Sequence, residues 1–492
     1  MTGADLLVLS PELILLGAGT LILAVDLILG RERTRRVVPV LALAGLLAAL
    51  VTVFLIRGGD APVATMLTVD HFALFFKAVA IIGMALVVLA TINYIERRSP
   101  YAGEFYALLL AATLAMTIAV SANNLILIYL GLEFLSITSY ILAGFVRNDR
   151  RGSEAALKYF LYGSTASAIM LYGFSLLYGI AGTTDLAGIG RAIATQGASS
   201  LRGLTFPAVV LMLAGLGFKA SLVPFHQWAP DAYDGAPTPV AAFLSTASKA
   251  TGFAILVRLL LTALPMQPAQ GDWVAILAGV SMVTMTLGNL IAIRQTNIKR
   301  LLAYSSIAQA GYILIGLVAA SLPSGAVVNG VNGLMIYLFA YLFTNVGAFV
   351  AVLAVEERTG SVEIRDYAGM IRRSPWLAAV LTIFLLSLAG IPPTGGFLGK
   401  FFVFGAAVQE QLLTLAVVGA INSALSAWYY LNVVRVMFMT AGADESPIHL
   451  APSVQVVLAV AVAFTLLIGL YPQPFIGWAT WATQTVQFLA AR

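Results

Sequence analysis

Charged side chains are scarce in this sequence, and the scarcity limits the kind of protein it can be. Asp, Glu, Lys and Arg make up 10% of the 492 residues, whereas 60% are hydrophobic and the mean hydropathy is +0.95. Soluble globular chains contain about 25% charged residues. The shortage excludes a water-soluble fold of this size and predicts an all-α polytopic membrane protein. The formal net charge of +5 does not indicate nucleic-acid binding, because most arginines lie in short loops between apolar runs.

Cysteine is absent and histidine is rare. The lack of cysteine excludes disulfides, thiol catalysis and cysteine-ligated iron–sulfur clusters. The three histidines, His71, His226 and His449, are far apart in the sequence, so a haem or metal site has little to build on. We therefore expect the chain to bind no cofactor and no metal, and to carry no redox centre of its own.

The apolar runs divide the chain into membrane spans. A transmembrane helix needs about 20 mostly apolar residues, and Arg, Pro, Gly and Asp mark the loops between such runs. We expect the first span to be retained, because residues 1–16 carry Asp5 and Glu12 and lack the positive region of a signal peptide. We expect about fourteen spans, at residues 10–29, 37–56, 72–93, 104–121, 123–145, 154–180, 205–231, 237–262, 272–294, 299–321, 329–355, 375–407, 411–438 and 453–471.

The distribution of Lys and Arg predicts the orientation of these spans. The odd-numbered loops hold seventeen Lys and Arg residues, and the even-numbered loops and the tail hold four: Arg57, Arg191, Arg202 and Arg492. Basic residues favour the cytoplasmic side. We therefore expect both termini on the outer side, which in a bacterium is the periplasm, and a multi-pass protein of the cell (inner) membrane surrounded by lipids.

Among the acidic residues, only Glu133 lies near the middle of a predicted span. A charge at the bilayer centre costs about 2.5–3.5 kcal/mol on insertion scales, so such a residue persists where it pairs, lines a wet cavity or has a function. Tyr129 and Ser136, at helical spacing on either side, make its face polar. We expect a functional role for Glu133.

Lys219 lies deep in the seventh span, close to Pro224. Proline removes its own N–H and clashes with the carbonyl four residues earlier, here that of Ala220. We expect a broken helix whose freed carbonyls need protein or water as partners and whose negative dipole end favours the Lys219 ammonium. His226 is then either a proton relay or a structural histidine that bonds the broken backbone.

A second broken helix is predicted in the twelfth span, over LSLAGIPPTGGFLGKF. Pro392 and Pro393 free the carbonyls of Leu388 and Ala389, and the neighbouring glycines permit a non-helical crossing. Lys400 follows this break, and we expect it to be functional.

Lys249 lies near the middle of the eighth span, where helical spacing places Ser245 and Thr246 on its side, and we expect it to be functional too. Lys158 is about one turn inside the sixth span. It is either a channel residue or a lysine that extends its ammonium to the interface and pairs with Glu154 four residues earlier. Tyr304 is a weaker polar candidate. Three charged residues near span ends are expected at the membrane interface: Lys77, Asp26 and Arg258.

These residues place one carboxylate and several lysines on different helices near mid-membrane. Burial disfavours the charged form of a lysine and a nearby carboxylate favours it, so its protonation state can be switched. A chain of such groups, bridged by water and hydroxyls, predicts a proton path with an electrostatic gate. The broken spans are five helices apart and cross in opposite directions, which predicts two inverted five-helix repeats, spans 4–8 and 9–13. The matching division of the chain is 1–100, 101–265, 266–440 and 441–492.

Four long motifs carry a family resemblance: YLGLEFLSITSYILAGF, SEAALKYFLYGS, LGFKASLVPFHQWAPDAYDGAPTPVAAFLSTASKA and LSLAGIPPTGGFLGKF. They resemble the antiporter-like membrane subunits of respiratory complex I, the proton-translocating NADH–quinone oxidoreductase, and are closest to the subunit N type, also called subunit 2. The resemblance covers roughly residues 123–405. A lysine at position 400 fits subunit N better than subunit M, which has a glutamate there.

The resemblance implies a translocase subunit that pumps protons while quinone is reduced elsewhere in the complex. NADH, FMN, iron–sulfur clusters and quinone are then expected in partner subunits, with subunit M and small subunits such as K as neighbours. It also implies a pair of Glu133 and Lys219, a central Lys249, a terminal Lys400 and a further channel residue, Lys158.

Two other functions are weighed against this one. An Mrp-type Na⁺(cation)/H⁺ antiporter subunit shares the motifs of spans five and seven, but a carboxylate-rich sodium site would favour it, and Glu133 is the only acid at mid-membrane. A purely structural scaffold would have to explain four buried charges. The direction of each half-channel and the electron donor, NADH as against ferredoxin or F420, stay open.

Overall fold

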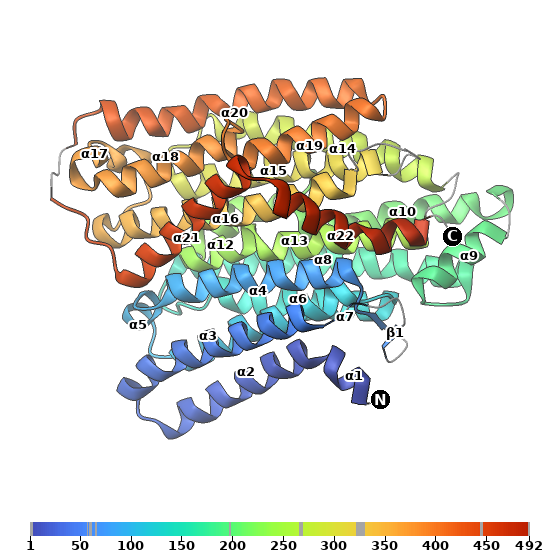
Figure 1. The fold of residues 1–492 in the computed structure, drawn as a ribbon, viewed down its shortest axis with the longest axis horizontal. Coiled ribbons are helices and arrows are strands. Elements are labelled where there is room, and N and C mark those ends of the chain that lie inside the picture. Colours follow the sequence, from blue (N-terminus) through green and yellow to red (C-terminus); the bar gives the residue numbers. More distant parts are fainter. Residues whose placement is uncertain are drawn as a thin grey trace. The chain divides into compact units, whose positions relative to one another are not determined.

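A computed structural model describes residues 3–56, 58, 62–63, 66–195, 198–264, 269–320, 330–442 and 446–490. Two arginines of the orientation count, Arg57 and Arg492, lie outside these residues, and the side chain of Arg202 is not described. The described chain is almost entirely helical (Figure 1), with one short antiparallel hairpin that pairs β1 (Pro62–Val63) with β2 (Leu67–Thr68). The all-α prediction is confirmed.

The chain forms two compact units. Unit 1 comprises Met1–Ser221, Ala247–Ile276 and Ala479–Arg492, and unit 2 comprises Leu222–Thr246 and Leu277–Trp478. The chain therefore passes from one unit to the other inside the predicted seventh span and again inside the eighth. The division at 100, 265 and 440 stays a prediction.

Unit 1 is built from helices whose apolar faces pack on one another: α2 contacts α3 and α6, and α13 contacts α4, α6 and α10. Polar N-caps begin several of them. The Asp70 carboxylate accepts from the backbone N–H of Ala73 at 2.8 Å, and Asn124 caps the backbone N–H of Ile126 at 2.9 Å. Its helices are α1 (Gly3–Val8), α2 (Ser10–Ile28), α3 (Arg31–Leu55), α4 (His71–Thr91), α5 (Tyr94–Arg98), α6 (Ala102–Ser121), α7 (Leu125–Ala143), α8 (Arg150–Ala181), α9 (Leu186–Thr195), α10 (Ala198–Ala220) and α13 (Ala247–Ala263).

Unit 2 has α16 at its centre, in contact with α12, α15, α18, α19 and α21, and α16 is buried from Gly330 to Val355. Its helices are α11 (Trp228–Gly235), α12 (Thr238–Ser245), α15 (Ile298–Ala320), α16 (Gly330–Thr359), the 3₁₀ helix η1 (Ile364–Tyr367), α17 (Met370–Arg373), α18 (Pro375–Ala389), α19 (Gly395–Gln409), α20 (Leu413–Met439) and α21 (Pro452–Leu470). Two helices, α14 (Ala269–Ala292) and α22 (Gln473–Ala490), have parts in both units.

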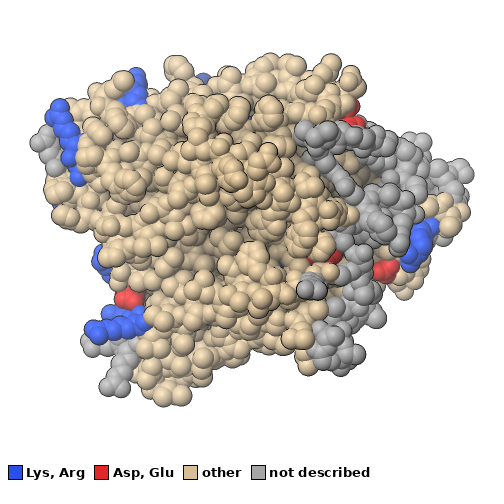
Figure 2. Space-filling model, viewed as in Figure 1, with Lys and Arg blue, Asp and Glu red and all other residues tan. Residues whose placement is uncertain are grey.

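The predicted spans correspond to helices throughout. Within the described residues, thirteen helices are long and apolar enough to cross a membrane. The remaining predicted span, 375–407, is the pair of shorter helices α18 and α19. Figure 2 shows a face on which Lys, Arg, Asp and Glu cover little of the surface, and large apolar side chains such as Leu27 and Trp428 are exposed. These are the features of a multi-pass membrane protein. The helices α9 and α22 and the hairpin were not predicted.

Both predicted helix breaks are present, and there is a third. Helix α10 ends at Ala220, before Pro224, and α18 ends at Ala389, where Gly390 has φ +87°. The eighth span, predicted as one helix over 237–262, is interrupted at Thr246 (φ −121°, ψ −87°), between α12 and α13. The prediction of an unbroken eighth span is therefore wrong.

Contacts between loops follow the predicted alternation. In unit 1 the even-numbered loops meet, because Asn123 donates to Thr68 at 2.9 Å and Asn124 donates to Thr184 at 2.8 Å. In unit 2 the odd-numbered loops meet, since Arg358 donates to Ser446 at 2.8 Å. Because loops of the same parity meet, the spans between them cross in alternating directions, as predicted. These contacts leave open which side is cytoplasmic.

Candidate functional site

Lys219 occupies the last turn of α10, directly before the first helix break. Its side chain is 4% exposed, and its Nζ has no hydrogen-bond partner among the residues that the structure describes. Gly252 of α13 packs against its stem, because a Cβ at Gly252 would lie 3.1 Å from the Lys219 Cγ. A buried ammonium without a hydrogen bond is costly. The charge of Lys219 therefore depends on electrostatic compensation by other groups.

Glu133 lies on α7 in the same unit, partly buried. Its carboxylate accepts a short hydrogen bond from the hydroxyl of Ser167 on α8. Glu133 is close enough to Lys219 for the two charges to interact electrostatically. Unit 1 therefore places the predicted carboxylate and the predicted lysine within electrostatic range of each other, as expected.

Lys249 lies in the first turn of α13, three residues before Gly252, and is 1% exposed. The helix is interrupted at Thr246, so Ser245 and Lys249 do not lie on one continuous helix, as the predicted spacing assumed. The Ser245 hydroxyl donates to the carbonyl of Ala242 at 2.9 Å and accepts from Asn345 at 2.7 Å. The Lys249 position is buried as predicted.

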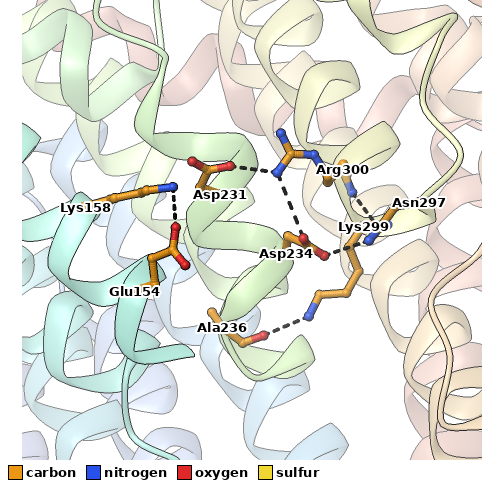
Figure 3. Close-up of polar contacts among 8 residues, drawn as sticks. All are labelled: Glu154, Lys158, Asp231, Asp234, Ala236, Asn297, Lys299 and Arg300. Carbon is orange, nitrogen blue, oxygen red and sulfur yellow. Dashed lines mark hydrogen bonds and ion pairs between the residues drawn. The ribbon is translucent and has the colours of Figure 1, made fainter. Parts of the chain in front are cut away.

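Lys158 points toward Glu154 from the same helix, α8 (Figure 3), and their ion pair measures 2.7 Å between Nζ and Oε1. The side chains are 42% and 66% exposed. This is the exposed i, i+4 pair that was one of the two predicted alternatives. Such a pair contributes only about 0.3–0.5 kcal/mol to stability, and it leaves a role as a channel residue untested.

Two charges that were expected at the interface are buried inside unit 1. The Arg258 guanidinium binds the Asp70 carboxylate through two hydrogen bonds of 3.0 and 2.7 Å, and the Lys77 ammonium lies 2.8 Å from a carboxylate oxygen of Glu12. Arg258 is 5% exposed and Lys77 is fully buried. A partner from a distant segment makes the burial of each charge inside the protein tolerable, and the interfacial expectation for both residues stays a prediction. Asp26, the third of these residues, is half-buried against Gly103 of α6.

Lys400 lies in unit 2, on α19, beside the second helix break. Its Nζ donates to the carbonyls of Leu388 and Ala389 at 3.0 and 2.9 Å and to the Ser423 hydroxyl at 2.9 Å. The Tyr312 ring lies below it, with Nζ 4.8 Å from the ring centroid. The two carbonyls are those that Pro392 and Pro393 were predicted to free. Unlike Lys219, this buried ammonium has three oxygen acceptors.

A buried polar network next to Lys400 was missed by the sequence reasoning. Gln309 of α15 donates to the Leu388 carbonyl at 2.9 Å and accepts a short hydrogen bond from Tyr337, and Tyr430 shares a short hydrogen bond with Ser305. Tyr304, the residue that was singled out in this stretch, is only half-buried. The missed signal is a spacing: Ser305, Gln309 and Tyr312 recur at i, i+4 and i+7, which places them on one helix face.

His226 lies in the turn between α10 and α11, in unit 2. It is half-buried, and its Nδ1 is buried without a hydrogen-bond partner among the described residues. The adjacent backbone N–H of Val223 donates to the Thr284 hydroxyl at 3.1 Å, so a side chain from α14 holds the turn. Both alternatives for His226, relay and structural residue, stay open.

A second ionic cluster lies at the N-terminus of α15 (Figure 3). Arg300 binds Asp231 at 2.7 Å and lies 4.0 Å from Asp234, while Asn297 donates to Asp234 at 2.8 Å and caps α15 through the backbone N–H groups of Lys299 and Arg300. The Lys299 ammonium donates to the Ala236 carbonyl at 2.9 Å. These contacts join the α11–α12 segment, directly after the first helix break, to α15.

The comparisons with known proteins agree with this arrangement. Residues 122–426 match the family described as NADH:quinone oxidoreductase/Mrp antiporter, TM. NADH-quinone oxidoreductase subunit N of Desulfitobacterium hafniense is 43% identical over 488 residues, which cover 96% of this chain and 97% of that protein. The chain belongs to the NADH-quinone oxidoreductase subunit N family. The resemblance read from the four motifs is confirmed.

Solved structures place this subunit N family member in a broader structural group. A chain of respiratory complex I from Thermus thermophilus is 32% identical, with a TM-score of 0.78 over 95% of this chain and 98% of that one. A chain of the Mrp complex from Dietzia sp. DQ12-45-1b has a TM-score of 0.84 over the full length of both chains, but is 22% identical and shares the fold alone. Chains of both complexes therefore share this fold.

Proposed function

We propose that the chain is a proton-translocating membrane subunit of an NADH-quinone oxidoreductase, respiratory complex I, and that Glu133, Lys158, Lys219, Lys249 and Lys400 carry its protons. The observation that carries the proposal is Lys219. Its amine is buried at a helix break, has no hydrogen-bond partner among the described residues and lies within electrostatic range of the Glu133 carboxylate, so movement of that carboxylate would change how readily the amine holds a proton.

The Glu133 carboxylate acts as the gate for Lys219. While the carboxylate is charged and near, it stabilises the protonated lysine. Moving or neutralising it leaves the ammonium in apolar surroundings without compensation, which favours release of the proton. Ser167 donates a hydrogen bond to Glu133 and so helps to hold the carboxylate in position.

Lys400 has different surroundings from Lys219, because three oxygen acceptors and an aromatic ring surround its ammonium. We assign Lys249 the role of the central lysine of the path, and Lys158, with its exposed ion pair, a place near its mouth. His226 is either a proton relay or a residue that holds the turn at Pro224.

The same proposal covers the surroundings of the chain. Its relatives are named as subunits of an oxidoreductase, which supports NADH, FMN, iron–sulfur clusters and quinone being bound by partner subunits. Subunit M and a small subunit such as K are the proposed neighbours. The excess of Lys and Arg in odd-numbered loops supports a bacterial cell (inner) membrane location with both termini on the periplasmic side. The inverted repeats over spans 4–8 and 9–13 belong to this proposal too.

The Mrp-type antiporter is the weaker alternative. The relative with 43% identity is named subunit N, and the Mrp chain shares the fold at 22% identity.

The decisive experiment uses Lys219→Ala and Lys249→Ala in the whole membrane complex. We expect both variants to assemble and to lose most of the NADH-driven proton uptake into inverted membrane vesicles. An Arg191→Ala variant serves as the comparison, because this side chain is 76% exposed and lies outside the proposed path. Normal proton-to-electron ratios in both buried-lysine variants would overturn the relay. Sodium flux in proteoliposomes without an electron donor would instead support the antiporter.

A further inference from the structure

The second helix break leaves two neighbouring backbone carbonyls without helical donors. In an α-helix a carbonyl accepts from the N–H four residues later. For Leu388 and Ala389 those residues are Pro392 and Pro393, which have no N–H. Both carbonyls lie at the end of α18, inside unit 2, and both residues are buried. Because a buried carbonyl without a partner is costly, the donors have to come from side chains.

Each of these two carbonyls has two side-chain donors, and only one of the two is Lys400. The Leu388 carbonyl accepts from the Lys400 ammonium at 3.0 Å and from the Gln309 amide of α15 at 2.9 Å. The Ala389 carbonyl accepts from Lys400 at 2.9 Å and from the Ser423 hydroxyl of α20 at 3.2 Å. A carbonyl oxygen has two lone pairs and can accept both donors. Each carbonyl therefore has a donor that does not depend on Lys400.

The Gln309 amide is fixed in one orientation. Its side chain is 1% exposed. Its nitrogen has to face the Leu388 carbonyl, because a carbonyl oxygen can only accept. Its oxygen accepts a short hydrogen bond from the Tyr337 hydroxyl of α16, and its nitrogen also lies 3.4 Å from the Tyr430 hydroxyl. A flip of the amide would place two oxygens against each other, so the network keeps the donor directed at Leu388.

The number of N–H groups on Lys400 depends on its protonation state. The ammonium has three, which match its three oxygen acceptors, whereas a neutral amine has two and a lone pair. Release of a proton to the next group of the path therefore leaves one oxygen without its Lys400 donor. We propose that Gln309 is a positioning residue for Lys400, which holds the Leu388 carbonyl in place while the lysine is neutral. This inference rests on the proposed function.

A double-mutant comparison tests whether the two donors share the carbonyl. Gln309→Met and Lys400→Met keep the length of each side chain and remove its donor. With Lys400 present, Gln309→Met leaves the Leu388 carbonyl one donor. In the Lys400→Met background it leaves none among the described residues. Thermal unfolding of the full-length chain in detergent measures the difference. We expect the fall in melting temperature caused by Gln309→Met to be about twice as large in the Lys400→Met background, because an unsatisfied buried group costs more than one lost hydrogen bond.

The matched control is Gln295→Met in the same unit. The Gln295 amide donates to the Ile291 carbonyl at 3.1 Å, away from the break, and its loss should lower the melting temperature equally in both backgrounds. Equal falls for Gln309→Met would overturn the inference. So would failure of either single variant to fold, since the remaining donor should hold the carbonyl. Failure of the Gln309 double variant alone is the expected coupling in its strongest form.

Proton uptake by the whole membrane complex separates this inference from the proposed function. We expect Lys400→Met to lose most of the NADH-driven uptake and Gln309→Met to lower the proton-to-electron ratio several-fold. A normal ratio in Gln309→Met overturns the inference. Equal falls in melting temperature together with lost uptake in Lys400→Met overturn it too, but leave the proposed function standing. Normal uptake in Lys400→Met overturns the proposed role of Lys400, whatever the melting temperatures show.

Discussion

The guanidinium of Arg258 and the carboxylate of Asp70 form a buried two-bond ion pair between residues that are 188 positions apart in the chain. Asp70 also caps α4 through the backbone N–H of Ala73, and the Arg258 guanidinium lies 5.3 Å from the centroid of the Phe72 ring. The pair joins the start of α4 to α13, the helix that carries Lys249. It therefore fixes the lysine-bearing helix within unit 1.

Breaking this pair from one side should be far more harmful than replacing both partners. Arg258→Leu leaves a buried carboxylate without its cation, and we expect a loss of about 3–5 kcal/mol. In the double variant with Asp70→Asn, which keeps the cap, the loss should be smaller than that of Arg258→Leu alone. Thermal unfolding of the purified protein in detergent measures both. Glu154→Gln, in the exposed pair with Lys158, is the control and should change stability by less than about 1 kcal/mol. Additive losses from Arg258 and Asp70 would contradict the coupling.

Gly390 sets the position of the Lys400 side chain. Its φ is +87°, and a Cβ there would lie 2.7 Å from the Lys400 Cδ. We expect Gly390→Ala to strain the turn and displace the ammonium from its carbonyl acceptors, lowering NADH-driven proton uptake several-fold. Gly405 lies on α19, the helix that carries Lys400, and a Cβ there meets no atom within 4 Å. Gly405→Ala should therefore leave uptake unchanged. Equal uptake in the two variants would show that the position of Lys400 does not matter for pumping.

Gly252 permits the close approach of α13 to Lys219, and the effect of substitution should grow with side-chain size. With the Lys219 Cγ 3.1 Å from an added Cβ, Gly252→Ala needs only a small shift of a flexible stem, and we expect modest loss of proton uptake. Gly252→Leu cannot be accommodated in the same way and should abolish most of it. Gly179→Leu on α8, where no atom lies within 4 Å, is the matched control. Equal proton uptake in all variants of the series would mean that Gly252 does not constrain the aliphatic stem of Lys219.

Ser167 tests the Glu133 gate without removing a charge. Ser167→Ala deletes the donor to the carboxylate, and hydrogen bonds to charged groups are worth about 1.5–3 kcal/mol. We expect proton uptake to fall, but less than in Glu133→Gln. Ser164→Ala, whose hydroxyl donates only to the carbonyl of Leu161 on the same helix, should behave like the parent. A loss of uptake in Ser164→Ala equal to that in Ser167→Ala would indicate a general effect on α8.

Several features could be predicted from the sequence because they depend on chemistry within a few residues. Span positions follow from runs of apolar residues, because a lipid bilayer admits only helices that satisfy their own backbone. The breaks at Pro224 and at Pro392–Pro393 follow from the missing N–H of proline. The binding of Lys400 to the carbonyls of Leu388 and Ala389 could be expected from the same rule, since the ammonium lies close to them along the chain.

The interruption of the eighth span at Thr246 has no corresponding signal in the sequence. No proline or glycine lies at that point, and what holds it includes a hydrogen bond from Asn345, 100 residues away, to Ser245. The network of Gln309, Tyr337 and Tyr430 likewise joins three helices that are distant in the chain.

The sequence by itself determined the membrane class, the spans and the family. These depend on composition, on periodicity and on proline, which act within a few residues. Only the tertiary structure decided how each buried charge is compensated. Arg258 and Lys77 each pair with a carboxylate, and Lys400 donates to two carbonyls and a hydroxyl. Lys219 has a carboxylate within electrostatic range but no hydrogen bond among the described residues. The physical reason is that the energy of a buried charge depends on the partners that packing brings to it. These partners come from distant segments of the chain, and local sequence patterns do not indicate which distant segments will be in contact.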